Sequence, residues 1–292
     1  MMQVDALSKD FGRRPAIRDI SFEVAPGEIF GLLGHNGAGK STTFGICLGQ
    51  IHADRGRVVI DGFDVANDRA RALDGVGAIY EAPAFYDYLS GWRNLEFFVS
   101  LSAVPDRKRL EEVVDLVGLA GRIQDPVRTY SHGMRQRLAL AQALLPSPRL
   151  ILLDEPTEGL DPEGIHEIRE TIRRLRDERG LSIVLSSHLL HEVEQLCDRV
   201  AILQAGQLVF SGRWQDARKN QNVFRIVGDA GLSDALLELG AASAGPNRWH
   251  LPHDAEPAHV LRKLIESGSS VGEFAREIET LEDFYLGLLT KP

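Results

Sequence analysis

The segment that most constrains the fold of this chain is rich in glycine and lies at residues 34–42. It reads Gly34-His35-Asn36-Gly37-Ala38-Gly39-Lys40-Ser41-Thr42 and fits the pattern G-x-x-x-x-G-K-[ST]. In this pattern, glycines let the backbone approach a polyphosphate that a side chain would keep away. Residues 28–33 before the segment are apolar enough for a short buried strand, and residues 41–50 have helical spacing. The order of strand, glycine loop and helix predicts a P-loop NTPase-type α/β fold that binds a nucleoside triphosphate.

The same pattern assigns a task to individual groups of the loop. The N–H groups at the start of the following helix point at the α- and β-phosphates, where the helix dipole favours negative charge. Lys40 reaches the β- and γ-phosphate oxygens, and the Ser41 hydroxyl is placed to bind Mg²⁺. A chance glycine-rich turn is the alternative, but it does not explain the strand and the helix on either side. We expect the whole segment from Gly34 to Thr42 to contact the nucleotide.

The composition narrows the classes of function. The 33 basic and 42 acidic residues give a formal net charge of −9, whereas a dedicated nucleic-acid binder usually presents a basic stripe. Cys47 and Cys197 lie far apart without metal-binding spacing, so we expect two reduced, buried thiols of a cytosolic protein. The chain has no run of about 18 apolar residues and no signal-peptide core. We expect a protein on the cytoplasmic side, without a nucleic-acid partner, that serves a membrane only through another subunit.

Strand-like and helical segments alternate along most of the chain, which predicts a mostly parallel sheet. Residues 2–24 hold two strand-like runs and predict an antiparallel β part at the N-terminus. From about residue 90 to 146 the spacing is helical, which indicates a helical subdomain. The composition changes after about Arg213. We expect a nucleotide-binding domain at 1–212 and a small C-terminal α+β domain at 213–292, in which strands and helices alternate and a ferredoxin-like order is one interpretation.

A second apolar strand, Leu150–Leu153, ends in two carboxylates, Asp154 and Glu155. In a P-loop enzyme the acid at the strand end holds Mg²⁺, usually through water, and the next acid can polarise the attacking water. Apolar strands also end in solvated acidic pairs that have no catalytic task. The P-loop upstream favours the catalytic interpretation.

Three further segments carry a resemblance to a known family. They are Tyr130–Arg137 (YSHGMRQR), Asp154–Pro162 (DEPTEGLDP) and Ser186–His188 (SSH). Together with the P-loop, and in the expected order over about residues 2–212, they resemble the ATP-binding-cassette (ABC) ATPase family. The resemblance implies an ATPase that uses ATP and Mg²⁺. It implies that Glu155 is the general base, that His188 contacts the γ-phosphate and orients the attacking water, and that Lys40 completes the catalytic set.

The resemblance also implies a site shared by two subunits. Ser131 and Gly133 match the signature motif that caps the γ-phosphate of an ATP on the opposing subunit, and Asp161 matches a residue that communicates across the dimer. Phe11 matches an aromatic residue that stacks on adenine, with an ordinary core phenylalanine as the alternative. The implied partners are a second copy of this chain or a paired ABC subunit, and separate membrane-spanning permease subunits at the cytoplasmic face of the membrane.

Three positions depart from the usual family pattern. His132 and Met134 replace a glycine and a glutamine of the signature motif, which indicates a changed γ-phosphate contact or a specialised partner. Glu81 stands where most of the family has Gln, and either residue offers an oxygen to Mg²⁺. The expected Mg²⁺ ligands are Ser41, Glu81 and Asp154. The loop at 82–91 resembles the bacitracin- and lantibiotic-type exporters, so we expect export of a drug, a peptide antibiotic or a similar substrate.

Several alternatives stay open. Soluble ABC proteins that remodel nucleic acids or ribosomes carry two cassettes or a long coiled coil, and this chain shows neither. A nucleotide-binding switch without a transport role is a second alternative, disfavoured by the intact catalytic set. A transporter of the opposite direction is a third. The aromatic loop Phe85–Tyr88 is expected to pass motion to the membrane subunits, with ordinary packing of the helical subdomain as the alternative.

Overall fold

The computed structural model describes residues 1–80, 84–101, 104–217, 223–229, 231–252, 255–277 and 279–289. The chain divides into two compact units, Met1–Trp214 and Gln215–Pro292, which are described separately below. The boundary expected after residue 212 lies close to this division. No helix among the described residues combines the length and the apolar character needed to cross a membrane.

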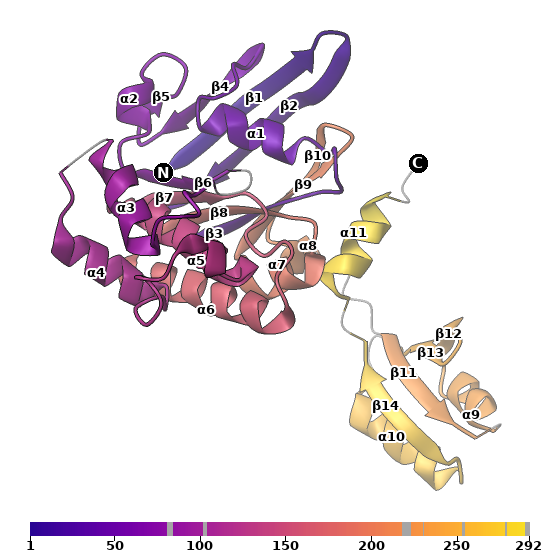
Figure 1. Cartoon of the computed structure of the whole chain (residues 1–292). Coiled ribbons are helices and arrows are strands. Elements are labelled where there is room, and N and C mark those ends of the chain that lie inside the picture. Colours follow the sequence, from indigo (N-terminus) through magenta and orange to yellow (C-terminus); the bar gives the residue numbers. More distant parts are fainter. Residues whose placement is uncertain are drawn as a thin grey trace. The chain divides into compact units, whose positions relative to one another are not determined.

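A large sheet runs through the first unit (Figure 1), and among the described residues it has ten strands. In spatial order they are β5 (Phe63–Asp64), β4 (Arg55–Ile60), β1 (Met2–Phe11), β2 (Arg14–Val24), β10 (Gln207–Gly212), β9 (Arg199–Gln204), β3 (Ile29–Leu33), β8 (Ser182–Ser187), β7 (Leu150–Leu153) and β6 (Val76–Ile79). The five strands from β9 to β6 are parallel, and the four from β5 to β2 are antiparallel. The expected fold, mostly parallel with an antiparallel N-terminal part, is confirmed.

The central strands are buried along their whole length. Every residue of β3, β7 and β8 is buried, as expected for parallel strands that are covered on both faces. Their continuous apolar sequence explains why the segments before the P-loop and before the acidic pair are recognisable as strands. Because these strands are parallel, the P-loop after β3, the acids after β7 and His188 after β8 all emerge at the same edge of the sheet.

Helices complete the first unit. They are α1 (Lys40–Cys47), α2 (Arg69–Ala72), α3 (Gly91–Ser100), α4 (Arg107–Leu116), α5 (His132–Leu144), α6 (Pro162–Arg179), α7 (Leu190–Leu196) and, at the division between the units, α8 (Trp214–Ala217). The helices α3, α4 and α5 pack on one another, and α5 also contacts β6 (Figure 1). This is the helical segment expected at about 90–146.

The two cysteines lie in the first unit, Cys47 at the end of α1 and Cys197 just after α7. Both are free and buried, so the expectation of two buried, unpaired thiols is confirmed. Burial raises the pKa of Cys47 to about 12, because a buried thiolate loses its hydration. Burial also raises the pKa of Cys197, so both thiols favour the protonated, less nucleophilic form.

The second unit has its own small sheet and core. Its elements are β11 (Val223–Gly228), α9 (Leu232–Glu238), β12 (Ala242–Gly245), β13 (Arg248–His250), α10 (Pro257–Glu266), β14 (Val271–Arg276) and α11 (Leu281–Leu289). The strand order β12-β13-β11-β14 is antiparallel throughout, which with two intervening helices is a ferredoxin-like arrangement. Phe224, Ile226, Leu236, Trp249 and Leu264 form its core.

The expected alternation of strand and helix misses one element of this unit. The strand β12 has the sequence Ala-Ser-Ala-Gly, without a β-branched or aromatic residue, so nothing in its composition indicates a strand. It exists because it pairs with β13, whose Trp249 anchors the hairpin in the core.

Candidate functional site

The P-loop lies between the buried strand β3 and the helix α1. Gly39 has a φ of +105° at the N-cap of α1, and a Cβ atom there would lie 2.5 Å from Cγ2 of Ile17, so only glycine fits. The first backbone bond at this helix end runs from the N–H of Thr43 to the carbonyl of Gly39 (2.9 Å). The N–H groups of Lys40, Ser41 and Thr42 precede it and are therefore available to an anion.

The P-loop borders a cleft of about 630 Å³ in the first unit. Residues from three parts of the chain line it: Ala16; His35, Asn36, Gly37, Ala38, Gly39, Lys40, Ser41 and Thr42; His132, Gln136, Asp154, Glu155, Glu158 and Gly159. Of the expected phosphate-binding segment, only Gly34 is missing from this lining, and its carbonyl instead accepts a hydrogen bond from Nζ of Lys40 (2.8 Å). The cleft has the size and the loop that a nucleotide requires.

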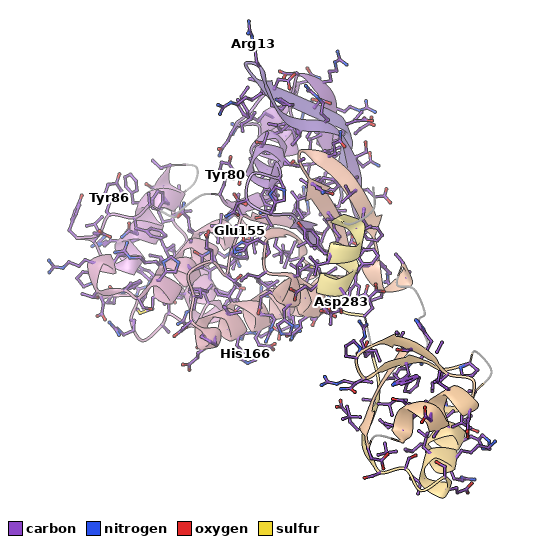
Figure 2. All side chains as sticks on the ribbon, turned by 90° about the vertical axis from the view of Figure 1, so that its right-hand side faces the viewer. Arg13, Tyr80, Tyr86, Glu155, His166 and Asp283 are labelled. Carbon is purple, nitrogen blue, oxygen red and sulfur yellow. The ribbon has the colours of Figure 1, made fainter. Side chains whose placement is uncertain are left out.

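Three expected catalytic side chains form a network of polar contacts, and two of them, Lys40 and Glu155, line this cleft. Nζ of Lys40 lies 3.0 Å from Oε1 of Glu155, and Nδ1 of His188 lies 2.9 Å from Oε2 of the same carboxylate. Lys40 is buried, Glu155 is mostly buried and His188 is exposed. Figure 2 shows Glu155 in the middle of this unit. The structure thus brings Lys40, Glu155 and His188 together at one carboxylate.

Two residues near Lys40 and Glu155 offer oxygen ligands suited to Mg²⁺. The side chain of Ser41 is exposed at the cleft and Asp154 lines the same cleft. Oδ1 of Asp154 accepts a hydrogen bond from the Ser186 hydroxyl; within the part of the chain that the structure describes, Oδ2 has no such partner. A hydroxyl and a carboxylate oxygen are ligands that Mg²⁺ prefers, so these two residues fit the ion. Glu81, the third expected ligand, lies outside the described residues.

Phe11 lies at the end of β1, and 52 % of its surface is exposed. The alternative of an ordinary core phenylalanine is therefore wrong. Nζ of Lys9 lies 5.7 Å from the centre of the Phe11 ring, a cation–π contact. Phe11 does not line the phosphate cleft, which suits a residue expected to contact the base rather than the phosphates.

The residues expected to act on a second subunit line a separate hollow of about 450 Å³. Ser131 caps α5 by accepting a hydrogen bond from the N–H of Met134 (3.2 Å), and Asp161 caps α6 by accepting one from the N–H of Gly164 (2.9 Å). Gly133 lines the hollow between them. These residues are close together, but they are not part of the chain formed by Lys40, Glu155 and His188.

His132 and Gly159 border both the cleft and the hollow. Nε2 of His132 donates a hydrogen bond to the carbonyl of Glu158 (3.0 Å), which joins the start of α5 to the loop before α6. The replacement of a signature glycine by His132 therefore has a structural consequence within the chain that the sequence did not indicate. Gln136, Glu158 and Gly159 also line the cleft, although no contact with the nucleotide was expected for them. They lie within the segments Tyr130–Arg137 and Asp154–Pro162, whose motifs gave a role to other residues.

Comparison with known proteins decides the family. The model of the family described as "ABC transporter" matches residues 17–158. "Uncharacterized ABC transporter ATP-binding protein YhcH" of Bacillus subtilis is 45 % identical over 76 % of this chain and 73 % of its own length. The chain belongs to the ABC transporter family. It is the ATP-binding subunit of an ABC transporter and an ATPase, and such subunits function with membrane permeases.

Two further similarities extend this family assignment. "Bacitracin transport ATP-binding protein BcrA" of Bacillus licheniformis is 40 % identical to this ABC subunit, over 97 % of its chain and 95 % of the relative. A solved structure titled "Structure of ATP binding subunit of ABC transporter" has a TM-score of 0.67 and 30 % identity, covering 75 % of this chain and 92 % of the other. The first similarity spans both units of the ABC subunit.

Proposed function

We propose that this ABC subunit hydrolyses ATP to power export of a peptide antibiotic or a similar drug through separate membrane-spanning subunits. The contacts of Glu155 with Lys40 and His188 support ATP hydrolysis, because a protein that uses nucleotide binding only as a switch needs no general base beside the P-loop. The similarity to a bacitracin transport ATPase over nearly the whole chain supports the substrate class and the direction.

In this proposal, Glu155 accepts a proton from the attacking water. The water oxygen forms a bond to the γ-phosphorus, the bond to the ADP oxygen breaks, and ADP and phosphate leave. His188, 2.9 Å from the carboxylate, holds Glu155 and the water in line. Lys40 moves from Glu155 to the incoming phosphates, which carry more negative charge, and this releases the base when ATP binds.

Ser41 and Asp154 would hold Mg²⁺ at the phosphates. The ion, when bound with ATP, neutralises charge that develops on the phosphate oxygens. Asp154 follows the buried strand β7 and Ser41 lies in the first turn of α1, so both ligands are fixed by rigid elements.

A second subunit would complete the site. Ser131, Gly133 and Asp161 line a hollow separate from the catalytic chain of their own molecule, so they are available to the ATP of another one. A hydroxyl and N–H groups at the start of α5 suit a phosphate. The partner is a second copy of this chain or a paired ABC subunit, and Phe11 would stack on the adenine.

The aromatic loop offers a face to the permease. Tyr86 packs against Phe97 of α3, with 5.0 Å between ring centres, while Tyr88 is largely exposed. Figure 2 shows Tyr86 at the periphery of the unit, away from Glu155. The loop thus packs against the helical subdomain through Tyr86 and exposes Tyr88 to solvent. Contact between this loop and the permease would hold the subunit at the cytoplasmic face of the membrane. Residues 213–292 would form a separate accessory domain.

The variant Glu155→Gln tests the proposal. It keeps the shape of the side chain and removes the base, so we expect ATP binding to persist while kcat falls about 100- to 10,000-fold. The variant is also expected to form an ATP-dependent dimer in size-exclusion chromatography. Glu178→Gln, an exposed change on α6, is the matched control and should behave like the parent.

Two results would contradict the proposal. If Glu155→Gln hydrolyses ATP at the parental rate, Glu155 is not the base. If the parent, reconstituted with its permease in vesicles, moves no peptide antibiotic outward but takes up a substrate, the direction is wrong. Co-purification with a permease separates either result from the nucleotide-switch alternative.

A further inference from the structure

Ser186 lies at the point where the ends of β7 and β8 meet. Its hydroxyl donates a hydrogen bond to Oδ1 of Asp154 and accepts one from the backbone N–H of Glu155 (2.9 Å). A hydroxyl can donate and accept at the same time, so both bonds coexist. Ser186 has 0 % exposure and therefore cannot touch the nucleotide.

The backbone that Ser186 holds is unusual. Glu155 has a φ of +47°, in the left-handed region that residues other than glycine rarely adopt. Such a conformation persists only where its surroundings hold it. The N–H of Asp154 is bound to the carbonyl of Ile79 (2.8 Å), and the carbonyl of Glu155 accepts a bond from Glu158 (3.1 Å). The bond to Ser186 fixes the N–H between them, and with it the turn that directs Glu155 toward Lys40.

The pairing of β7 with β8 therefore positions three residues of the site, which are Asp154, Glu155 and His188. β7 and β8 are parallel, with Leu153 opposite Leu185, so Ser186 faces the first residue after β7. Two positions after Ser186, the chain reaches His188, which contacts the carboxylate of Glu155. The serine ties the backbone of the proposed base to the strand that carries its partner. Few other groups could do this at a buried position, since the site needs a small donor and acceptor in one atom.

We propose that Ser186 is a positioning residue for ATP hydrolysis, an inference that rests on the function proposed above. Its hydroxyl binds Oδ1 of Asp154, so that Oδ2 would be left for Mg²⁺, and it locks the left-handed turn of Glu155. Partners that hold a metal ligand in place commonly matter nearly as much as the ligand. Ser186 acts through Asp154 and Glu155 and touches neither ATP nor water.

The experiment compares Ser186→Ala with Ser182→Ala in the purified full-length chain. Ser182 is a matched control, because it lies on the same strand, is equally buried, and its hydroxyl also accepts a backbone hydrogen bond, from Gly27 (2.8 Å). It lies at the opposite end of β8. For Ser186→Ala we expect kcat to fall about 10- to 100-fold and the Mg²⁺ concentration for half-maximal activity to rise about tenfold. For Ser182→Ala we expect neither change.

Two additional measurements separate positioning from stability. Binding of a fluorescent ATP analogue in EDTA and the thermal midpoint should be the same for Ser186→Ala and Ser182→Ala. Ser186→Thr restores the hydroxyl and should recover most of kcat, while Ser186→Cys, whose thiol is a weaker donor, should lie between Thr and Ala. If Thr does not fold in this buried place, the Cys variant still ranks the effect of the donor.

The outcomes distinguish this inference from the proposed function. If the parent is an active ATPase and Glu155→Gln is inactive, but Ser186→Ala keeps the kcat and Mg²⁺ dependence of Ser182→Ala, the inference about Ser186 is wrong. If Ser186→Ala loses activity only in proportion to a lowered thermal midpoint, the residue is structural and the inference is also wrong. If Glu155→Gln is as active as the parent, the proposed function fails first.

Discussion

The P-loop cleft and the hollow lined by Ser131, Gly133 and Asp161, here called the signature hollow, differ in the partners of the side chains expected to act on ATP. In the P-loop cleft, side chains bind one another: Lys40 and His188 both contact Glu155, and Ser186 binds Asp154. In the signature hollow, Arg137 and Glu167 form an ion pair (3.2 Å). Within the described part of the chain, however, the side chains of Ser131 and Asp161 act as helix caps, and each accepts a hydrogen bond from a backbone N–H. The expected catalytic side chains are thus tied to one another, whereas Ser131 and Asp161 are bound to the backbone at helix ends. This difference agrees with the proposal that Ser131 and Asp161 act on the ATP of a second subunit.

Ser131→Ala challenges this contrast most directly. If the hydroxyl binds the γ-phosphate of a second subunit, its removal should lower kcat about 100-fold, as loss of one donor at a developing charge does. ATP binding by the isolated subunit should not change, since Ser131 does not line the cleft. Steady-state kinetics and nucleotide binding measure the two effects separately.

The control for that variant is Ser90→Ala. Ser90 caps α3 by accepting a hydrogen bond from the N–H of Arg93 at 3.2 Å, the same distance that Ser131 has to Met134. Both variants lose a helix cap, which costs about 1 kcal/mol of stability. Only Ser131→Ala should lose turnover. Equal loss in both variants would mean that capping alone explains Ser131, and the contrast between the hollows would disappear.

Some residues of the P-loop cleft could be predicted from the sequence, and others could not. Lys40, Asp154 and Glu155 were predictable because each follows a buried strand in a pattern whose chemistry requires that residue type. Ser186 was not, although it stands in the segment that led to His188. A serine carries no spacing rule, and its importance depends on the left-handed turn of Glu155, which only the folded backbone reveals.

The fold divides in the same way. The core strands of the first unit are continuous apolar runs and were predictable as such, and so were the helices that end at glycine or proline. The hairpin partner β12 was missed because its pairing, and not its composition, makes it a strand. The tie between His132 and Glu158 was missed because it joins residues 26 positions apart.

Asp161→Ala sharpens the comparison with a smaller effect. Asp161 caps α6 and lines the signature hollow, so the variant should lose about 1 kcal/mol of stability and, beyond that, about tenfold in kcat. Asp106→Ala is its counterpart, because Asp106 caps α4 by accepting a bond from the N–H of Lys108 (3.0 Å) outside both hollows. Denaturant unfolding should show similar losses for the two variants, and ATPase assays a loss only for Asp161→Ala. The same kcat in both would leave Asp161 a cap and nothing more.

Phe11→Ala is expected to have the smallest effect on ATPase activity. It tests whether Phe11 contacts the base and takes no part in the phosphate chemistry. Stacking of a base on an aromatic ring is worth about 1 kcal/mol at an exposed position, so KM for ATP should rise about fivefold while kcat stays unchanged. Phe11 lies outside the phosphate cleft, hence the chain of Lys40, Glu155 and His188 should remain intact. Phe11→Trp, with a larger ring, should restore or lower KM. GTP should respond to both variants much as ATP does, because a ring face does not read the base edge. If kcat changes and KM does not, Phe11 takes part in catalysis, and the prediction that it contacts only the base is wrong.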